Sequence, residues 1–270
     1  MLFRYVAGSN VTECIKRANL LLNKGKTPVI NFAVENTKNK ESVFNEYQKL
    51  NSKINEDYRV ALKLSSLYFD DNLISKTVNM FKENNVKILI DAESDELNDK
   101  YQDYVNKLII DHNQNSPSII KTYQMYRIDS LDTLLTDIEV FKSHNLWHGI
   151  KLVRGAYWNS EHKQGHLFTN KTDTNKSYNE GIYRIFQSDN NKMLPILATH
   201  NTESINLGLL FNEFKPIFEF GHLMGMKEGK YKNNKYPVNV YIPYGPFDEM
   251  MPYLIRRLYE NADSVKYMFN

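Results

Sequence analysis

Eight apolar, β-rich runs alternate with amphipathic stretches along almost the whole chain, and this alternation constrains the fold more than any other feature. The runs cover residues 29–34, 60–64, 86–90, 119–125, 149–153, 194–198, 216–220 and 238–244. Between them, segments such as 72–85, 96–112 and 202–214 carry apolar residues at helical spacing. Eight strand–helix repeats of roughly 30 residues in a chain of 270 predict a closed α/β barrel of the (β/α)8 TIM type.

An open, doubly wound sheet is the alternative to the barrel. No G-x-G-x-x-G motif follows the first strand, so the usual dinucleotide-binding signature of that fold is missing. No linker rich in Pro, Gly or Ser interrupts the pattern. We therefore predict one domain over residues 1–270, with an amphipathic lead-in helix within 1–26, the barrel over 27–262 and a C-terminal tail over 263–270. Ser130 is the expected N-cap of the helix after the fourth strand.

Charge and cysteine content exclude several classes of protein. The 34 basic and 32 acidic residues nearly cancel, unlike the strongly basic balance of a dedicated nucleic-acid binder. The single Cys14 excludes an intrachain disulfide and a thiolate zinc site, and it fits a reducing compartment. No apolar run approaches the ~20 residues of a membrane span. We predict a cytoplasmic protein, with a mitochondrial location or peripheral membrane association left open.

Histidines occur twice at i,i+4 spacing, as His144 with His148 and as His162 with His166. Neither pair forms a His-Glu-x-x-His motif or has a nearby third ligand of obvious type, and a zinc site needs three or four ligands. The sequence therefore predicts no metal site.

Polar and charged side chains gather at the carboxyl ends of the predicted strands, where a barrel carries its chemistry. They are Lys63, Asp91, Glu93, Lys151, Arg154, Thr199, His200, Asn201, Tyr241 and Tyr244. Each alone would also fit a surface side chain or a salt-bridge partner. Because buried charge is costly unless it is neutralised, their convergence on one barrel mouth predicts an anionic ligand or cofactor.

The last predicted helix, residues 248–262, places Tyr253, Arg256, Arg257 and Glu260 in one sector beside its apolar stripe. Two adjacent guanidinium groups match the geometry of a carboxylate or a phosphate, and Glu260 can hold one of them in place. A solvated helix face with an Arg256–Glu260 ion pair is the alternative. Because this helix follows the eighth strand, we expect the sector to lie at the barrel mouth and to bind a carboxylate substrate.

Eight strand-end motifs occur in a fixed order along the chain. They are Ala-Leu-Lys-Leu-Ser at Lys63, Ile-Asp-Ala-Glu at Asp91, Tyr-Gln-Met-Tyr at Gln124, Lys-Leu-Val-Arg-Gly-Ala-Tyr-Trp at Lys151, Ala-Thr-His-Asn at Ala198, Phe-Gly-His-Leu-Met-Gly-Met at Leu223, Tyr-Ile-Pro-Tyr-Gly-Pro at Tyr241 and Pro-Tyr-Leu-Ile-Arg-Arg-Leu-Tyr-Glu-Asn at Arg256. The ordered set resembles the proline dehydrogenase family of flavin-dependent barrel enzymes. The resemblance spans almost the whole chain, is closer to the eukaryotic members, and implies a monofunctional enzyme.

This resemblance implies FAD-dependent oxidation of L-proline to 1-pyrroline-5-carboxylate, the first step of proline catabolism. A hydride would pass to the flavin, and a quinone or another electron acceptor would reoxidise it. Three alternatives stay open: a dehydrogenase of hydroxyproline or another cyclic imino acid, a different flavin barrel such as a folate reductase, and a catalytically silent barrel that binds proline or a partner protein.

The resemblance also implies roles for individual residues. Arg256 and Arg257 would bind the proline carboxylate, with Lys63 as a third cation, and Asp91 would hold the hydroxyl of Tyr241. The full set of residues implied for substrate and catalysis is Lys63, Asp91, Tyr157, Leu223, Tyr241, Tyr253, Arg256, Arg257 and Glu260. The set implied for the cofactor is Gln124, Lys151, Arg154, Gly155, Ala156, Trp158, Thr199, His200 and Asn201.

Two departures from the family pattern affect these roles. Lys151 and Arg154 stand in the reverse order to many bacterial relatives, which leaves open which of them lies nearest flavin N5. Glu35 follows Ala-Val at the end of the first strand, where other members have Leu-Gly, and a gating role for it is left open.

Overall fold

The structure, a computed structural model, describes residues 5–34, 39–226, 235–251 and 255. Its eight strands follow one another in chain order around a closed barrel, which confirms the predicted fold class. The chain divides into two compact units, residues 1–91 with 222–270 and residues 92–221, and each is described by itself.

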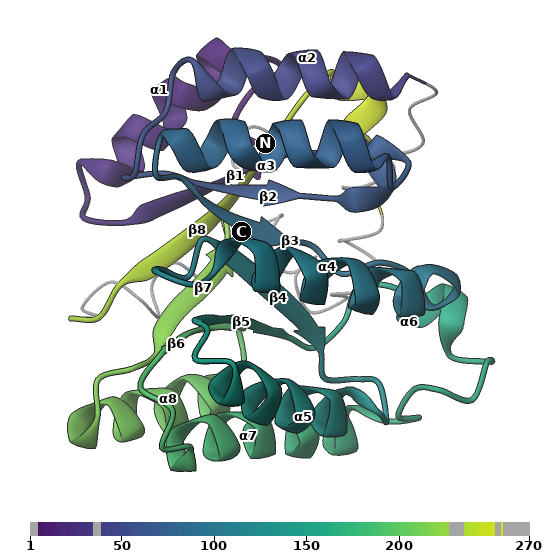
Figure 1. Cartoon of the computed structure of the whole chain (residues 1–270), viewed down its shortest axis with the longest axis vertical. Coiled ribbons are helices and arrows are strands. Elements are labelled where there is room, and N and C mark those ends of the chain that lie inside the picture. The colour runs from purple at the N-terminus through teal and green to yellow at the C-terminus, as the bar shows by residue number, and fades with distance from the viewer. Residues whose placement is uncertain (1–4, 35–38, 227–234, 252–254, 256–270) are drawn as a thin grey trace. The chain divides into compact units, whose positions relative to one another are not determined.

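Within its described residues, the first unit contains four complete parallel strands and three helices that precede or connect them. The strands are β1 (Thr27–Phe32), β2 (Arg59–Leu62), β3 (Lys87–Ile90) and β8 (Val238–Tyr244), and β1 pairs with both β2 and β8. The helices are α1 (Val11–Leu22), α2 (Lys40–Asn51) and α3 (Asp71–Glu83), and a 3-10 turn, η2 (Leu64–Leu67), follows β2. The predicted lead-in helix is α1, which runs alongside β1 and β8 (Figure 1).

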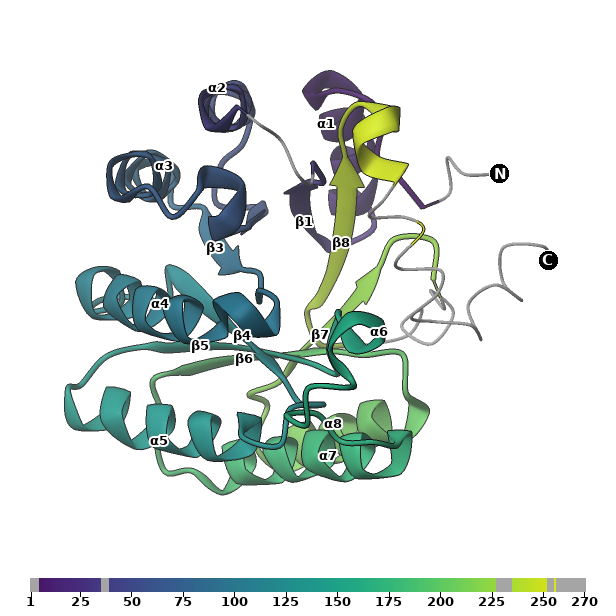
Figure 2. The same cartoon turned by 90° about the vertical axis from the view of Figure 1, so that its right-hand side faces the viewer.

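The second unit has the same organisation. Its strands are β4 (Ile119–Gln124), β5 (His148–Val153), β6 (Met193–Ala198) and the start of β7 (Glu219–Leu223), and neighbours in this order pair in parallel. The helices are η3 (Asp95–Leu97), α4 (Asn98–His112), α5 (Ser130–Ser143), α6 (Trp158–Glu161), α7 (Lys171–Gln187) and α8 (Thr202–Phe214). Helices α7 and α8 lie side by side (Figure 2).

Two differences from the predicted boundaries have a clear structural cause. The seventh strand begins at Glu219, three residues later than predicted, because the buried Asn212 side chain bonds both the N–H and the C=O of Phe218, each at 2.8 Å. Ser130 is the first residue of α5 rather than its N-cap, so that prediction was wrong. The cap position belongs to Asp129, whose carboxylate is held by Arg127 at 3.0 Å and makes no capping hydrogen bond.

Successive side chains of a strand point to opposite faces of the sheet, so only alternate residues of each strand can contribute to one site. On β4, Lys121 is fully buried and pairs with Asp137 of α5 at 2.6 Å, while the neighbouring Tyr123 hydroxyl donates to the same carboxylate at 2.7 Å. These side chains therefore face the helices, and Gln124 faces the other way. On β8, Tyr244 packs its ring 5.4 Å from that of Phe32, on the opposite face from Tyr241. Tyr244 therefore does not join the strand-end residues as the sequence predicted.

Candidate functional site

The most densely bonded of the predicted cofactor residues is Arg154, which follows β5 in the second unit. Its Nε donates to Asn175 Oδ1 at 2.8 Å, and its two terminal nitrogens donate to Thr199 Oγ1 at 2.5 Å and to Ser204 Oγ at 3.0 Å. The guanidinium also lies 4.4 Å from the centre of the Tyr178 ring. Burial lowers the pKa of Arg154, yet a guanidinium keeps its proton in proteins.

The hydrogen-bond partners of Arg154 within the described part of the chain are neutral. Among the described residues, no carboxylate lies within ion-pair distance of it, and three of the five N–H donors of a guanidinium are used. The carboxylate of Glu203 raises the pKa of Arg154 against the effect of burial, but it makes no ion pair with the guanidinium. A half-buried positive charge that no carboxylate contacts is costly. The arrangement therefore suits an anionic ligand that accepts the remaining N–H groups.

The backbone after Arg154 is held closely by its neighbours. Gly155 has a φ of +143°, and a Cβ there would lie 2.4 Å from the ring of Tyr126. The N–H of Ala156 donates to Gln124 Oε1 at 3.1 Å, and Gln124 Nε2 donates to the carbonyl of Glu93 at 3.1 Å. Only glycine fits at position 155, because the Tyr126 ring occupies the space that a side chain would need.

The predicted residues after β6 adjoin Arg154. Thr199 Oγ1 accepts from the N–H of Asn201 at 3.0 Å as well as from Arg154. Asn201 caps α8 by accepting from the N–H of Ser204 at 3.1 Å. His200 lies half-buried between Thr199 and Asn201, and Lys151 is buried in β5. The structure thus brings the ends of β5 and β6 together around one guanidinium.

Tyr157 and Trp158 continue the segment after β5. The Tyr157 hydroxyl donates to the carbonyl of Ala92 at 3.3 Å. Trp158, 40% exposed, stacks on His162 with ring centroids 4.6 Å apart and planes 15° from parallel. Trp158 therefore presents an aromatic surface at the start of α6.

In the first unit, the predicted substrate residues centre on Asp91 and Tyr241. The Tyr241 hydroxyl donates to Asp91 Oδ2 at 2.5 Å, so the expected hydrogen bond is present. The N–H of Asp91 donates to the carbonyl of Leu62, which places Asp91 at the end of β3 beside β2. Lys63 directly follows β2 and Leu223 ends β7, and both are half-buried.

Five predicted residues lie outside the described residues: Glu35, Tyr253, Arg256, Arg257 and Glu260. The helix that follows β8 is described only over residues 247–251 and 255. The carboxylate-binding sector of the last helix therefore stays a prediction from sequence.

Comparison with known proteins agrees with the resemblance seen in the motifs. The proline dehydrogenase family model matches residues 15–269. The chain belongs to this family.

Two curated relatives and one solved structure illustrate the similarity. Proline dehydrogenase 1, mitochondrial, of Dictyostelium discoideum is 32% identical over 211 residues, which cover 70% of this chain and 37% of that protein. Hydroxyproline dehydrogenase of Xenopus laevis is 32% identical over 199 residues, covering 66% of this chain and 42% of that protein. Proline utilization A from Bdellovibrio bacteriovorus aligns with a TM-score of 0.88 at 20% identity, covering 96% of this chain and 32% of that chain, and it shares the fold. The chain thus spans less than half the length of these relatives.

Sequence reasoning missed the residues that hold the family's strand-end motifs in place. Asn175 and Ser204 bond Arg154 from α7 and α8, and Glu161 of α6 bonds Tyr126 beneath Gly155. One signal was available for Ser204, because a polar residue that is fully buried in the first turn of a helix needs a partner nearby. Helical periodicity gives no such signal for Asn175 or Glu161.

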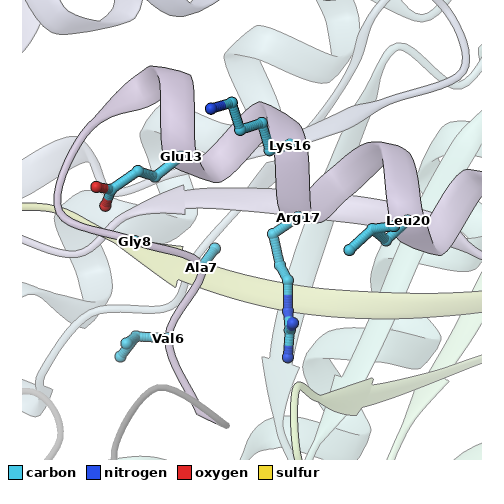
Figure 3. A pocket seen from close by; sticks show the side chains of 7 residues that line it. All are labelled: Val6, Ala7, Gly8, Glu13, Lys16, Arg17 and Leu20. Carbon is cyan, nitrogen blue, oxygen red and sulfur yellow. The ribbon is translucent and has the colours of Figure 1, made fainter.

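A separate cavity of about 380 Å³ lies in the first unit beside α1. It is lined by Val6, Ala7, Gly8, Glu13, Lys16, Arg17 and Leu20 (Figure 3). No predicted site residue lines this cavity, so it is not the candidate site.

Metal-binding clusters and membrane-spanning helices are both absent from the part of the chain that the structure describes. No three His, Cys, Asp or Glu side chains there gather closely enough to hold a metal ion. Within the same residues, no helix has the length and apolar character needed to cross a membrane.

Proposed function

We propose that this chain oxidises L-proline to 1-pyrroline-5-carboxylate with FAD as its cofactor, as the first step of proline catabolism. The observation that carries the proposal is the family match over residues 15–269, which includes every residue assigned to substrate or cofactor. Bound FAD would itself accept the hydride from the C–H bond of proline that is broken.

The residues around Arg154 suit this cofactor. FAD carries a negatively charged pyrophosphate, and Arg154 offers a positive charge whose hydrogen-bond partners among the residues described are neutral. Gly155 lets the ring of Tyr126 pack directly against the backbone that follows Arg154, which fixes the course of this segment. The residues that would hold FAD are Gln124, Lys151, Arg154, Gly155, Ala156, Trp158, Thr199, His200 and Asn201.

On the substrate side, the hydrogen bond to Asp91 fixes the orientation of the Tyr241 ring. A fixed ring is a suitable wall for the proline methylene groups, which need packing rather than hydrogen bonds. Leu223 would add apolar surface, as would Tyr157 and Tyr253. Arg256 and Arg257, supported by Glu260, would bind the carboxylate, and Lys63 would add positive charge. With the substrate so oriented, catalysis depends on position more than on a protein acid or base.

A hydroxyproline dehydrogenase is the second candidate, because one relative of 32% identity carries that name. The bulk of Tyr241 favours L-proline as the substrate, since a 4-hydroxyl on the substrate would crowd the tyrosine ring. The physiological electron acceptor would be a quinone or another carrier. A cytoplasmic location, and peripheral contact with a membrane, stay predictions beside the relatives named mitochondrial.

The test begins with the absorption spectrum of the purified protein, reconstituted with FAD if it is colourless. We expect a flavin spectrum that bleaches when L-proline is added without oxygen, and a higher kcat/KM for L-proline than for 4-hydroxyproline. Turnover with an artificial electron acceptor would eliminate the catalytically silent barrel. A protein that stays colourless after reconstitution would refute the proposal.

The carboxylate-binding role has its own test in Arg256→Met. We expect kcat/KM for L-proline to fall by a factor of roughly 30 or more, as loss of about 2 to 5 kcal/mol of charge pairing predicts. Arg184→Met is the matched control, because Arg184 is an exposed arginine of α7 paired with Glu180 at 2.7 Å. Equal kinetics in the two variants would contradict the assignment.

A further inference from the structure

The Glu161 side chain is buried at the end of α6, and the proposed reaction does not use it. It is 2% exposed, and each carboxylate oxygen accepts one hydrogen bond. Oε1 accepts from the backbone N–H of Asp95 and Oε2 from the hydroxyl of Tyr126, both at 2.8 Å. A buried carboxylate is costly without such partners, so both contacts are needed to keep it there.

Tyr126 links Glu161 to the segment proposed to contact FAD. Its ring lies directly against Gly155, where a Cβ would approach within 2.4 Å. Its N–H donates to the carbonyl of Arg154 at 2.7 Å, and its own carbonyl accepts from the N–H of Phe168 at 2.8 Å. Tyr126 thus contacts both ends of the excursion that the chain makes after β5, between Arg154 and Phe168.

Asp95 connects the same carboxylate to a second layer of contacts. Its side chain accepts from Arg127 and lies 2.9 Å from His166 Nδ1. Arg127 also pairs its backbone with Leu167. The carboxylate of Glu161 is therefore one point at which three segments of the second unit are joined: the one that begins at Ala92, the one that follows β4 and the one that follows β5.

We propose that Glu161 is a positioning residue for the cofactor: through Tyr126 and Asp95 it holds segment 155–158 in the conformation that binds FAD. This inference rests on the proposed function. Glu161 does not touch the cofactor in this scheme; it restricts the backbone that does. A segment held in its binding conformation loses less entropy when the ligand arrives.

Three substitutions separate the hydrogen bonds from the charge. Glu161→Leu removes both contacts, and Tyr126→Phe removes one while keeping the ring against Gly155. Glu161→Gln keeps both, because its amide oxygen accepts from the Asp95 N–H and its NH2 group donates to the Tyr126 hydroxyl once that hydroxyl turns. The control is Tyr101→Phe, which removes a buried hydroxyl that bonds both backbone groups of Thr122 at 2.9 Å, away from segment 155–161.

Two measurements give the readouts. Hydrogen exchange of the cofactor-free protein should show amides of 155–161 exchanging about ten-fold faster in Glu161→Leu and Tyr126→Phe, but not in Tyr101→Phe. Titration with FAD should show its Kd raised about ten-fold in the same two variants and largely restored in Glu161→Gln.

The outcomes distinguish this inference from the proposed function. Unchanged exchange in Glu161→Leu, or faster exchange with an unchanged Kd for FAD, would overturn the positioning role. A raised Kd that also occurs in Tyr101→Phe would overturn it too, since the effect would then be general loss of stability. If the wild-type protein binds no FAD, the proposed function and the cofactor role fail together, and hydrogen exchange still decides whether Glu161 holds the segment.

Discussion

Gly155→Ala is the substitution that most sharply tests how the segment after β5 is packed. The new Cβ would lie 2.4 to 2.5 Å from three carbons of the Tyr126 ring, whereas carbon atoms in contact lie ~3.5 to 4.0 Å apart. The ring would have to move by about 1 Å. Its hydroxyl is bonded to the buried Glu161, so this movement would break a hydrogen bond.

Two costs add at this position. A φ of +143° is rare for any residue with a side chain, and such strain costs of order 1 to 3 kcal/mol. Overpacking against the ring costs about 1 to 3 kcal/mol more. The free energy of unfolding should therefore fall by about 2 to 6 kcal/mol.

Gly165→Ala is the matched control on the same excursion of the chain. Gly165 also has a positive φ, +81°, but a Cβ added there would have no heavy atom within 4 Å. It should therefore cost only the backbone strain. Urea unfolding followed by circular dichroism measures both variants, and equal losses in the two would refute the packing argument.

Three further predictions concern other contacts. Tyr241→Phe removes the hydroxyl that donates to Asp91, so the free energy of unfolding should fall by about 1.5 to 3 kcal/mol in urea titrations; no change would contradict the contact. Arg154→Lys should raise the Kd for FAD at least about ten-fold, because one ammonium cannot reach all three acceptors, and an unchanged Kd in a flavin titration would count against the cofactor role. Burial, together with the charge of Lys121, holds the pKa of His148 well below 6.5, so only the unfolded chain binds this proton and stability should fall as pH drops below 6.5. His148→Gln should flatten that decline, and parallel stability curves for the two proteins would exclude this source of acid sensitivity.

The sequence predicted the elements well where a local signal coincided with the packing. Residues 202–214 and 238–244 form α8 and β8 with the predicted bounds, since Lys215-Pro216 follows the helix and Gly245-Pro246 follows the strand. The start of the seventh strand was predicted too early, because the side chain of Asn212, in the preceding helix, makes hydrogen bonds with the backbone N–H and C=O of Phe218. The β-propensity of residues 216–218 carries no information about a hydrogen bond from a side chain in the preceding helix.

The motif residues of the candidate site could be predicted from the sequence, whereas the residues that hydrogen-bond to them could not. Asp91 and Tyr241 were paired on the family resemblance, and the hydrogen bond between them is present. Two partners of Arg154, Asn175 and Ser204, were not foreseen, because they lie on two different helices whose inward faces are decided by tertiary packing. The spacing of residues along one chain segment carries no information about such convergence.

Because the groups that hold Arg154 are neutral, they determine how the binding of an anion there would depend on pH and salt. Amide and hydroxyl groups do not titrate near neutrality, and a guanidinium keeps its proton, so the charge of Arg154 itself is constant across the physiological pH range. Dissolved phosphate and high ionic strength, by contrast, would compete for or screen the same charge. Reconstitution should therefore be faster in dilute, phosphate-free buffer.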